Sequence, residues 1–597
     1  SILLSTLQEA RSDNMKLFLI ALITALLLPF AAADSLDDVI PAYESYVRST
    51  GHEEAVRLAG ESPHTWQDVR PGAVSARMET ARGLLRRVEE TDTDRVIDKA
   101  ILLRLLEADI VSAEMDLARI PFTGDWGFQA EPIFAALGES IDSVEEGEAW
   151  IDRLNDVPRY FAENVENMRR GIRTGWTAHA DPLGTMVGQI REQIVDDPAK
   201  SGLYTPFLSL SEDISPAQAE RLQAEGLQAV SNAIAAYRDT LFFIETEYSL
   251  YTREEAGIGS LPAGRAAYRA AVDFHTAGAG YSPEEIHMLG TSEVTRIRAR
   301  MDSVIEETGF EGSFKDFLAY LRTDPQFYPE TPEELLLAAE EISDRLRAIL
   351  PDYFGHLPDL DFEGQPVPAA IAEGYTTGRY SSGDAREGRK GIYLVNTYAL
   401  DQRPLYELPA LSAHEAVPGH HIQISLAQEM EAQPDFRREY YATAFGEGWG
   451  LYAESIAGEA GIYRTPYERF GALSYEMWRA CRLVADTGMH WYGWSREEAE
   501  ACFLENSALS PLNIRIEVTR YIGWPGQAVA YKVGELKIRE LRARAEQALG
   551  PAFDLKVFHD VVLGEGALPL DMLEWRVNQW IASQKSLSQP VPATAAN

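Results

Sequence analysis

Apolar residues recur at three- and four-residue spacing through most of this chain, and this spacing constrains the fold more than any other feature of the sequence. It is clearest over residues 81–106 and 216–246, where charged residues fill the positions between the apolar ones. Such a pattern places an apolar stripe along an α-helix, and the stripe must be buried against other helices. The sequence therefore predicts a mainly α-helical protein.

Two helix starts can also be read from the sequence. Ser282 and Thr331 are each followed by a proline and then by two glutamates. A hydroxyl side chain accepts a hydrogen bond from the first turn, proline suits the first helical position, and acidic residues are favourable near a helix N-terminus. We expect helices to begin directly after Ser282 and Thr331.

One stretch breaks the helical pattern. Residues 374–391 are rich in Gly, Ser, Tyr and charge, which predicts a loop. Residues 392–398 have the β-branched and aromatic content of a strand. At a sheet edge, this strand would hold an extended peptide through main-chain hydrogen bonds, and the alternative is a short structural hairpin.

The N-terminal residues indicate export. A lysine after Met15, an apolar run and then three alanines form the pattern of a secretory signal peptide. No later segment is apolar for long enough to cross a membrane, so we expect no membrane insertion after the signal is removed. We expect a periplasmic protein, with secretion as the second choice. The predicted segments are a spurious upstream piece (1–14), the signal peptide (15–33), one main domain (34–585) and a disordered tail (586–597).

The chain has a formal net charge of −39 at pH 7. This charge argues against nucleic acid and anionic membrane surfaces as partners, because both bind to basic patches. It favours solubility, and a preference for cationic substrates is a further interpretation. The two cysteines, Cys481 and Cys502, either form one disulfide or remain buried thiols.

A short segment carries the residues of a hydrolytic zinc site: His414, Glu415, His420 and His421. Such sites use three protein ligands and one open position for a water, whose proton a carboxylate takes. Two histidines four residues apart on a helix meet one metal ion, but here the second histidine follows at six or seven residues. On a regular helix, a residue six positions on points about 120° away.

Pro418 and Gly419 lie between these histidines and provide a cause of distortion. Proline removes a backbone N–H and clashes with the carbonyl four residues earlier, and glycine permits unusual dihedral angles. A bulged or broken helix would return His420 to the metal and leave His421 pointing elsewhere. The residues alone leave both histidines open as the second ligand.

The third ligand is expected from a later helix. Glu447 and Glu454 are seven residues apart and therefore share one helix face. Glycines flank Glu447 and leave room for close approach. Glu454 suits a role in orienting a histidine or the water, but either glutamate remains possible as the ligand.

A third group of residues lies between 519 and 534. Peptide hydrolysis needs a donor for the developing oxyanion, and Tyr521 or Tyr531 would supply a phenolic O–H. Arg520 or Lys532 would hold a substrate carboxylate. The alternative is aromatic core packing with basic residues at the surface.

At these residues the chain resembles the bacterial family catalogued as domain of unknown function 885. The resemblance covers roughly residues 35–585 and includes the strand at Asn396. It rests on three blocks, namely His414, Glu415, Pro418, Gly419, His420 and Gln423; Glu447, Gly448, Trp449, Leu451, Tyr452 and Glu454; and Arg520, Tyr521, Pro525, Gly526, Gln527, Tyr531, Lys532 and Gly534.

That family is similar to helical zinc peptidases such as angiotensin-converting enzyme and the oligopeptidases. The resemblance implies a two-lobed helical body with a deep cleft and a catalytic part at about 370–540. The strand predicted at 392–398 adds a small β-sheet next to the active-site helix. The resemblance implies one Zn²⁺ per chain held by His414, His420 and Glu447, with Glu415 as general base. It also implies a substrate-binding role for Asn396. Those relatives place their two histidines four residues apart, so this chain departs from them by two residues.

The sequence thus predicts an exported zinc metallopeptidase that cleaves short peptides, of carboxypeptidase or oligopeptidase type. Two alternatives stand beside this prediction. One is a zinc amidase acting on a non-peptide or cell-wall bond, and the other is a catalytically inactive peptide-binding protein. An intact glutamate beside His414 disfavours the inactive protein, because binding alone needs no base.

Overall fold

The computed structural model describes residues 35–587, except 52, 125, 370–371, 373–374, 386–387 and 431–432. The predicted upstream segment and signal peptide therefore lie outside the described residues, as does the predicted tail from residue 588 onward. The last described helix reaches Leu587, so the first two residues of the predicted tail are helical.

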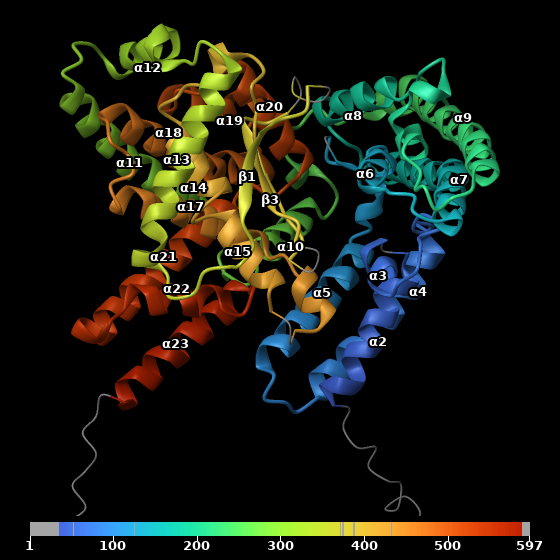
Figure 1. The fold of residues 1–597 in the computed structure, drawn as a ribbon, viewed down its shortest axis with the longest axis horizontal. Helices are drawn as coiled ribbons and strands as arrows, with labels where there is room; N and C mark the ends of the chain where they lie inside the picture. Colours follow the sequence, from blue (N-terminus) through green and yellow to red (C-terminus); the bar gives the residue numbers. More distant parts are fainter. Residues whose placement is uncertain are drawn as a thin grey trace, which may run out of the picture.

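The protein is mainly α-helical, as predicted, and the described residues also form a three-stranded sheet (Figure 1). The helices before the sheet are α2 (Leu36–Ser49), α3 (Glu53–Leu58), α4 (Pro71–Glu90), α5 (Val96–Glu114), α6 (Glu131–Gly138), α7 (Val144–Thr174), α8 (Ala180–Glu192), α9 (Pro216–Thr246), α10 (Gly264–Thr276), α11 (Pro283–Thr308), α12 (Phe314–Thr323) and α13 (Pro332–Tyr353). The helices after the sheet are α14 (Leu408–Glu415), α15 (His420–Gln428), α16 (Asp435–Glu439), α17 (Thr443–Glu459), α18 (Pro466–Thr487), α19 (Arg496–Asn506), α20 (Pro511–Gly523), α21 (Ala530–Leu549), α22 (Leu555–Leu563) and α23 (Leu570–Leu587).

The predicted helix starts are confirmed. Ser282 caps α11 in a reciprocal pair of hydrogen bonds with Glu285, and the Thr331 side chain accepts from the backbone N–H of Glu334. The helical stretch predicted at 216–246 coincides with α9. The amphipathic spacing and the capping residues thus place these helices correctly from local sequence alone.

The helical stretch predicted at 81–106 consists of two helices, α4 and α5, joined by a turn. Thr91 Oγ1 donates to the Arg87 carbonyl at 2.8 Å, and the Arg95 N–H donates to Thr93 Oγ1 at 3.0 Å. Short polar side chains that bond to the backbone in this way compete with helical hydrogen bonds. The helical periodicity was therefore predicted correctly, but the continuity of the helix was not.

Separate cores organise the helices. Helices α6 to α9 share one core, in which Phe161 of α7 packs edge to face on Tyr237 of α9 with ring centroids 4.8 Å apart. Helices α14, α17 and α21 belong to another core, on which the sheet also packs. A side chain on Gly448 of α17 would lie 2.5 Å from the backbone of Gly534 in α21. This close approach fixes the helix that carries Glu447.

The sheet has the strand order β1 (Phe362–Pro366), β3 (Gly391–Val395), β2 (Gly378–Ser381). β1 is parallel to β3, and β2 is antiparallel to β3 with Tyr380 opposite Tyr393. The predicted strand at 392–398 is β3, but it lies in the centre of the sheet and ends at Val395. The predicted loop at 374–391 contains β2, so the edge strand of this hairpin is β2 and not β3. Local composition identifies a strand but not its neighbours, because pairing is a tertiary property.

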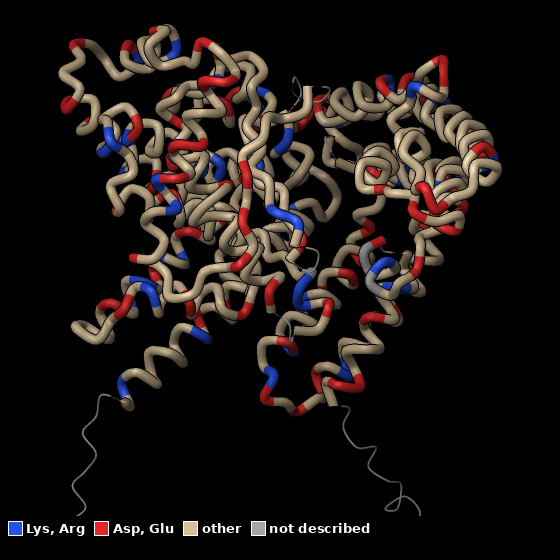
Figure 2. Tube along the Cα trace, viewed as in Figure 1, with Lys and Arg blue, Asp and Glu red and all other residues tan. Residues whose placement is uncertain are grey.

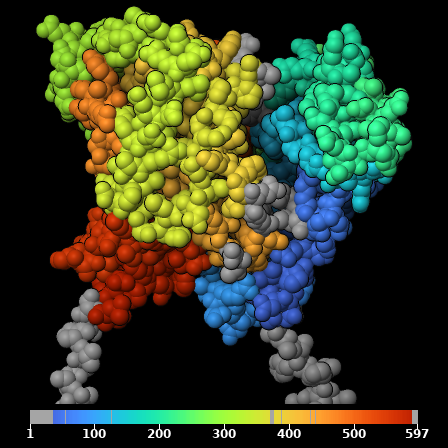
Figure 3. Space-filling view, viewed as in Figure 1, coloured from blue at the N-terminus to red at the C-terminus, as the bar shows by residue number. Residues whose placement is uncertain are grey.

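Charged positions are spread along the whole described part of the chain. Acidic positions occur on all groups of helices, with basic positions between them (Figure 2). In the space-filling view, the helices coloured blue to teal meet the rest of the molecule along a furrow beside the strands (Figure 3). Among the described helices, none is long and apolar enough to cross a lipid bilayer.

Cys481 and Cys502 form a disulfide that joins α18 to α19 across 21 residues of sequence. The sequence left this pairing open, and the structure decides it because the two helices pack against each other.

We expect reduction of this disulfide to destabilise the protein. Opening a loop of this length returns about 3 kcal/mol of chain entropy to the unfolded state, which corresponds to a Tm lower by about 3 °C for a chain of this size. Thermal unfolding with and without dithiothreitol measures the shift. The Cys481→Ser/Cys502→Ser variant is the control, because reductant should no longer change its Tm. An equal response of both proteins would contradict a stabilising role for the disulfide.

Candidate metal centre

Two histidines and a glutamate from three different helices meet in the structure. His414 is in the last turn of α14, His420 is the first residue of α15, and Glu447 is in α17. The Nε2 atom of each histidine lies 3.5 Å from Glu447 Oε2, and the ligand atoms of all three lie within 4.8 Å of one another. Both histidines are buried, and the side chain of Glu447 is 16% exposed. These are the three residues predicted to hold zinc.

The predicted break in the helix is present. α14 ends at Glu415, and a non-helical turn joins it to α15, which begins at His420. A side chain at Gly419 would lie 1.9 Å from the carbonyl oxygen of His414, so only glycine fits there. The carbonyl of Pro418 accepts a hydrogen bond of 2.8 Å from the indole of Trp449. The turn is thus packed against the end of α14 through Gly419 and against α17 through Pro418. As a result, the His420 ring lies next to the His414 ring, with centroids 4.8 Å apart.

The side chain of His421 points away from the cluster. Its Nδ1 lies 2.9 Å from the Tyr380 hydroxyl, and its Nε2 lies 3.0 Å from the Leu360 carbonyl oxygen. Burial lowers the pKa of His421 to about 4, so the ring is neutral at pH 7. His421 therefore joins α15 to the sheet, and the geometry favours His420 as the second ligand.

Glu454 lies behind His414. Its Oε1 is 2.9 Å from His414 Nδ1, on the opposite side of the ring from Glu447, and Arg479 Nη2 lies 3.5 Å from the same oxygen. A carboxylate in this position fixes the orientation of a metal-binding imidazole. The structure thus brings Glu447 into the cluster and places Glu454 behind it. A side chain at Gly450 would lie 2.6 Å from the His414 ring, so this glycine makes room for the imidazole.

The electrostatics of the cluster suit a cation. Although burial opposes the shift, hydrogen bonds to Glu447 and Glu454 raise the pKa of His414 to about 9. Burial also opposes the ionised form of Glu447, but hydrogen bonds from His414 and His420 hold its pKa well below the usual range. The cluster therefore contains an ionised carboxylate facing two imidazoles, whose shared protons a metal ion would replace.

The distances also fit zinc. Ligand atoms about 2.1 Å from a tetrahedral zinc ion lie about 3.4 Å from each other, close to the 3.5 Å between each imidazole and Glu447 Oε2. Two neutral histidines and one carboxylate form the ligand set of many hydrolytic zinc sites. These residues would hold the ion with small adjustments.

His420 lacks the supporting partner that His414 has. Its Nδ1 is buried without a hydrogen bond, and so is Oε1 of Gln423, three residues further along α15. Residues three apart share a helix face, so Gln423 Oε1 is the candidate acceptor for an N–H at His420 Nδ1. Gln423 belongs to the first of the three sequence blocks, but the sequence alone indicates no role for it.

The proposed base, Glu415, is held by the sheet. The backbone N–H of Tyr380 in β2 donates to Glu415 Oε2 at 2.9 Å. One carboxylate oxygen is therefore anchored, while the other is available to a water. This contact could not be predicted from the sequence, because β2 lies within the predicted loop at 374–391.

The two predicted phenols have different surroundings. The hydroxyl of Tyr521 is buried, donates to Glu517 Oε2 at 2.8 Å and accepts from Arg482 Nε at 2.9 Å. The Tyr531 ring packs under the Arg482 guanidinium at 4.3 Å. Tyr521 is therefore engaged in an internal network, and Tyr531 fits the predicted role of donor better.

Tyr441 is a further phenol close to the cluster. Burial by the surrounding protein, and then the charge of Glu447, raise the pKa of Tyr441 well above its usual range, although 48% of the residue is exposed. Tyr531 and Glu415 act in the same direction. A side chain at Gly446 would lie 2.6 Å from the Tyr441 ring. No sequence motif marks this position, because its closeness to Glu447 depends on how the chain enters α17.

The predicted substrate-binding residues are not gathered at the cluster. The amide of Asn396 donates to the carbonyls of Ala372, Tyr375 and Thr376, and it therefore stabilises the loop before β2.

Lys532 is fully buried. Its ammonium contacts carboxylate oxygens of Glu293, Glu476 and Glu535 at 2.6–3.1 Å. Arg520 remains partly accessible, with 21% of its side chain exposed, and donates to Gln527 Oε1 at 2.9 Å. Of the three, Arg520 is the best placed to meet a substrate carboxylate.

We expect the two neighbouring histidines to differ in metal binding. His420→Ala removes a ligand and should abolish stoichiometric zinc binding, whereas His421→Ala should keep about one zinc per chain. His421→Ala should instead lower stability by about 1–3 kcal/mol, because Tyr380 and Leu360 lose their partner. Atomic absorption and thermal unfolding measure the two effects. Loss of zinc from His421→Ala alone would reject the assignment of His420.

We expect Gln423 to contribute to zinc affinity through His420. Gln423→Leu removes the acceptor and should weaken zinc binding by about 10- to 100-fold. Gln423→Glu keeps an acceptor oxygen and should bind zinc at least as tightly as the wild type. Competition with a chromogenic chelator gives the Kd of each variant. Equal affinities of the leucine and glutamate variants would show that Gln423 does not support the ligand.

The comparisons with known proteins concern most of the chain. Residues 53–577 match the family described as "Bacterial protein of unknown function (DUF885)". No curated protein matches the sequence. A crystal structure from Colwellia psychrerythraea, described as a "putative lipoprotein", is similar with 27% identity and a TM-score of 0.84, over 92% of this chain and 100% of that one. A "putative lipoprotein of unknown function" from Shewanella oneidensis is similar in fold, with 15% identity and a TM-score of 0.72, over 91% of this chain and 99% of that one. By the match over residues 53–577, the chain belongs to the DUF885 family of bacterial proteins of unknown function.

Proposed function

We propose that the protein is an exported, zinc-dependent metallopeptidase that hydrolyses short peptides. One observation carries this proposal, namely that Glu415 follows His414 directly and is anchored by β2 beside the cluster of His414, His420 and Glu447. A protein that only stored or sensed a metal ion would need no carboxylate anchored next to it. The ligands, the base and the sheet together supply the parts that metal-assisted hydrolysis requires.

The residues would divide the work as follows. Zinc, when bound, would polarise the scissile carbonyl and acidify a water. Glu415 would accept the proton of that water through its unanchored oxygen and pass it to the departing amine. Glu454 would keep the His414 ring oriented, and Gln423 would do the same for His420.

The developing oxyanion needs a hydrogen-bond donor near the cluster. Tyr441 and Tyr531 are the phenols suited to this role. Tyr441 is close to Glu447 and to Tyr531, and its raised pKa keeps its hydroxyl protonated at pH 7. Tyr521 already donates to Glu517, so its hydroxyl would have to leave that partner to serve.

The substrate class is proposed from the surroundings of the site. The furrow beside the strands in Figure 3 would correspond to the cleft of two-lobed helical zinc peptidases, which favours short peptides over folded proteins. Arg520 would bind the carboxylate of a peptide's C-terminal end, consistent with a carboxypeptidase or oligopeptidase. The leader pattern before residue 34 supports export, with the periplasm as the proposed compartment.

We expect Glu415→Gln to abolish turnover without loss of the metal. Glutamine keeps the size of the side chain and an oxygen for the Tyr380 N–H but cannot accept a proton, so kcat/KM should fall by about 10²- to 10⁴-fold. Hydrolysis of a mixture of short peptides, followed by mass spectrometry, measures turnover, and atomic absorption measures zinc. Full activity of this variant would reject the mechanism.

A parallel screen separates this proposal from its alternatives. Cleavage of short peptides but not of cell-wall fragments supports the peptidase, and the reverse result identifies an amidase. Zinc-loaded protein that cleaves neither but binds peptides would be an inactive peptide-binding protein. A wild-type protein that holds no zinc would reject the metal centre itself.

A further inference from the structure

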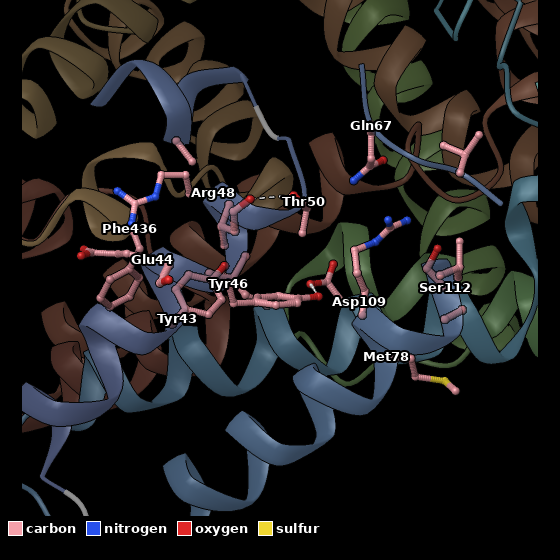
Figure 4. A pocket seen from close by; sticks show the side chains of 18 of the residues that line it. Tyr43, Glu44, Tyr46, Arg48, Thr50, Gln67, Met78, Asp109, Ser112 and Phe436 are labelled. Carbon is pink, nitrogen blue, oxygen red and sulfur yellow. Dashed lines mark hydrogen bonds between the residues drawn. The ribbon is translucent and has the colours of Figure 1, made fainter. Parts of the chain in front are cut away.

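A cavity of about 830 Å³ lies apart from the metal ligands, between the N-terminal helices and α16. Its walls come from α2, α4 and α5, from the chain around residue 67, and from Asp435, Phe436 and Tyr440 (Figure 4). Sites for small ligands commonly have volumes of about 300–1,000 Å³. The cavity is therefore large enough for a ligand, and its lining indicates which kind.

One wall of the cavity is aromatic. The Tyr43 ring packs edge to face on Phe436 with centroids 6.0 Å apart, and Tyr46 follows at 6.3 Å. Figure 4 shows these rings together with Glu44 on the same side of the cavity. The faces of such rings attract organic cations, because the ring quadrupole is negative above its plane.

Tyr43 also presents an unused polar group. The residue is only 7% exposed, yet its hydroxyl makes no hydrogen bond with any residue that the structure describes. The neighbouring hydroxyl of Tyr46, in contrast, donates to Asp109 Oδ2 at 2.9 Å. Because Tyr43 lines the cavity and its hydroxyl has no partner among the described residues, a ligand in the cavity would gain a hydrogen bond there.

The charged residues of the lining leave an excess of negative charge. Arg48 pairs with Glu61 at 4.0 Å, and Arg77 donates to the backbone of Asp68. Asp116 is already paired with Arg170. Glu44 makes no hydrogen bond or ion pair with the described residues. Burial, and then the charge of Asp435, raise the pKa of Glu44, so the surroundings of this carboxylate favour a cation beside it.

We propose that this cavity binds an organic cation, specifically an ammonium or guanidinium group carried by a peptide. The Glu44 carboxylate would pair with the cation, the Tyr43 and Phe436 rings would cover it, and the Tyr43 hydroxyl would accept one of its N–H groups. A guanidinium fills only part of the volume, and the remainder accommodates neighbouring peptide residues. Part of the protein's negative charge would thus serve to bind a cationic group of a peptide at this cavity.

The position of the cavity explains why a peptide is the expected carrier. Phe436 and Tyr440 line the cavity, and the next residue, Tyr441, faces Glu447 of the metal centre. The short segment between α16 and α17 is thus a wall shared by the cavity and the metal centre. A peptide bound at the metal centre would need to extend only past this segment to place a basic group in the cavity.

Calorimetric binding of two matched peptides tests the proposal. Ala-Ala-Arg-Ala carries the cation, and Ala-Ala-citrulline-Ala has the same shape without the charge. Both are titrated into the full-length Glu415→Gln protein, so that no hydrolysis interferes. We expect the arginine peptide to bind about 10-fold more tightly or better, which is the size of one desolvated cation–π and ion-pair contact.

The variants locate the binding site. Glu44→Gln should reduce the preference for arginine to about 3-fold or less. Tyr43→Phe should weaken the binding of both peptides, because the ureido group of citrulline also carries N–H donors. Glu90→Gln, an exposed glutamate at the end of α4, is the control with the same change of charge and should keep the full preference. Equal binding of both peptides to the parent protein, or a preference that survives Glu44→Gln, would overturn the proposal.

A third ligand tests the carrier. Butylguanidine that binds as tightly as the arginine peptide would overturn the peptide as carrier, whereas much weaker binding supports it. Because every arm measures binding and not turnover, the result is independent of the proposed peptidase activity. A protein without peptidase activity that still prefers the arginine peptide would retain this site and lose only the proposed function.

Discussion

The turn between α14 and α15 passes so close to the end of α14 that the α-carbon of Gly419 leaves no space for a side chain beside the His414 carbonyl. This contact lets His420, six residues after His414, face the same point in space. The same turn also fixes the position of α17, the helix that supplies Glu447, because the Trp449 indole of α17 donates to the Pro418 carbonyl. The arrangement of α14, α15 and α17 therefore depends on one close backbone approach. A regular helix with the same histidines would separate them by about 120°.

Around this turn the protein builds supporting layers of hydrogen bonds. Glu454 holds His414 from behind, β2 holds Glu415, and His421 ties α15 back to the sheet. Each of these partners lies outside the three-residue cluster, yet each limits how far a ligand or base can move. His420 is the exception, since its Nδ1 is buried without a partner beside an equally unpaired Gln423. The two histidines are therefore not held equally. His420, which follows the turn between α14 and α15, has fewer supporting hydrogen bonds than His414.

The metal centre and the cavity behind Phe436 are joined by only a few residues of chain. Tyr440 faces the cavity and Tyr441 faces Glu447, so neighbouring residues contribute to two distinct surfaces. The chemistry of the two surfaces differs. One gathers two imidazoles and a carboxylate that would suit a metal ion, and the other combines aromatic rings with the Glu44 carboxylate, which we propose to bind an organic cation. This closeness offers a physical route by which the proposed peptidase would distinguish basic from neutral peptides.

The sequence by itself determined the helical class, several helix starts, and the residues of the metal centre, because amphipathic spacing, capping residues and ligand chemistry are local properties. It also identified the cause of the helix break in Pro418 and Gly419.

The sequence left open the choice between His420 and His421, and between Glu447 and Glu454, because those choices depend on where other helices lie. It placed β2 in a loop and β3 at an edge, since strand neighbours are not encoded in local composition. The burial of Lys532 among three glutamates, the approach of Tyr441 to Glu447 and the cavity lined by Tyr43 and Glu44 could not be predicted for the same reason. Only tertiary packing decides which charges are enclosed, which phenols face a metal centre, and which carboxylates are left without a partner.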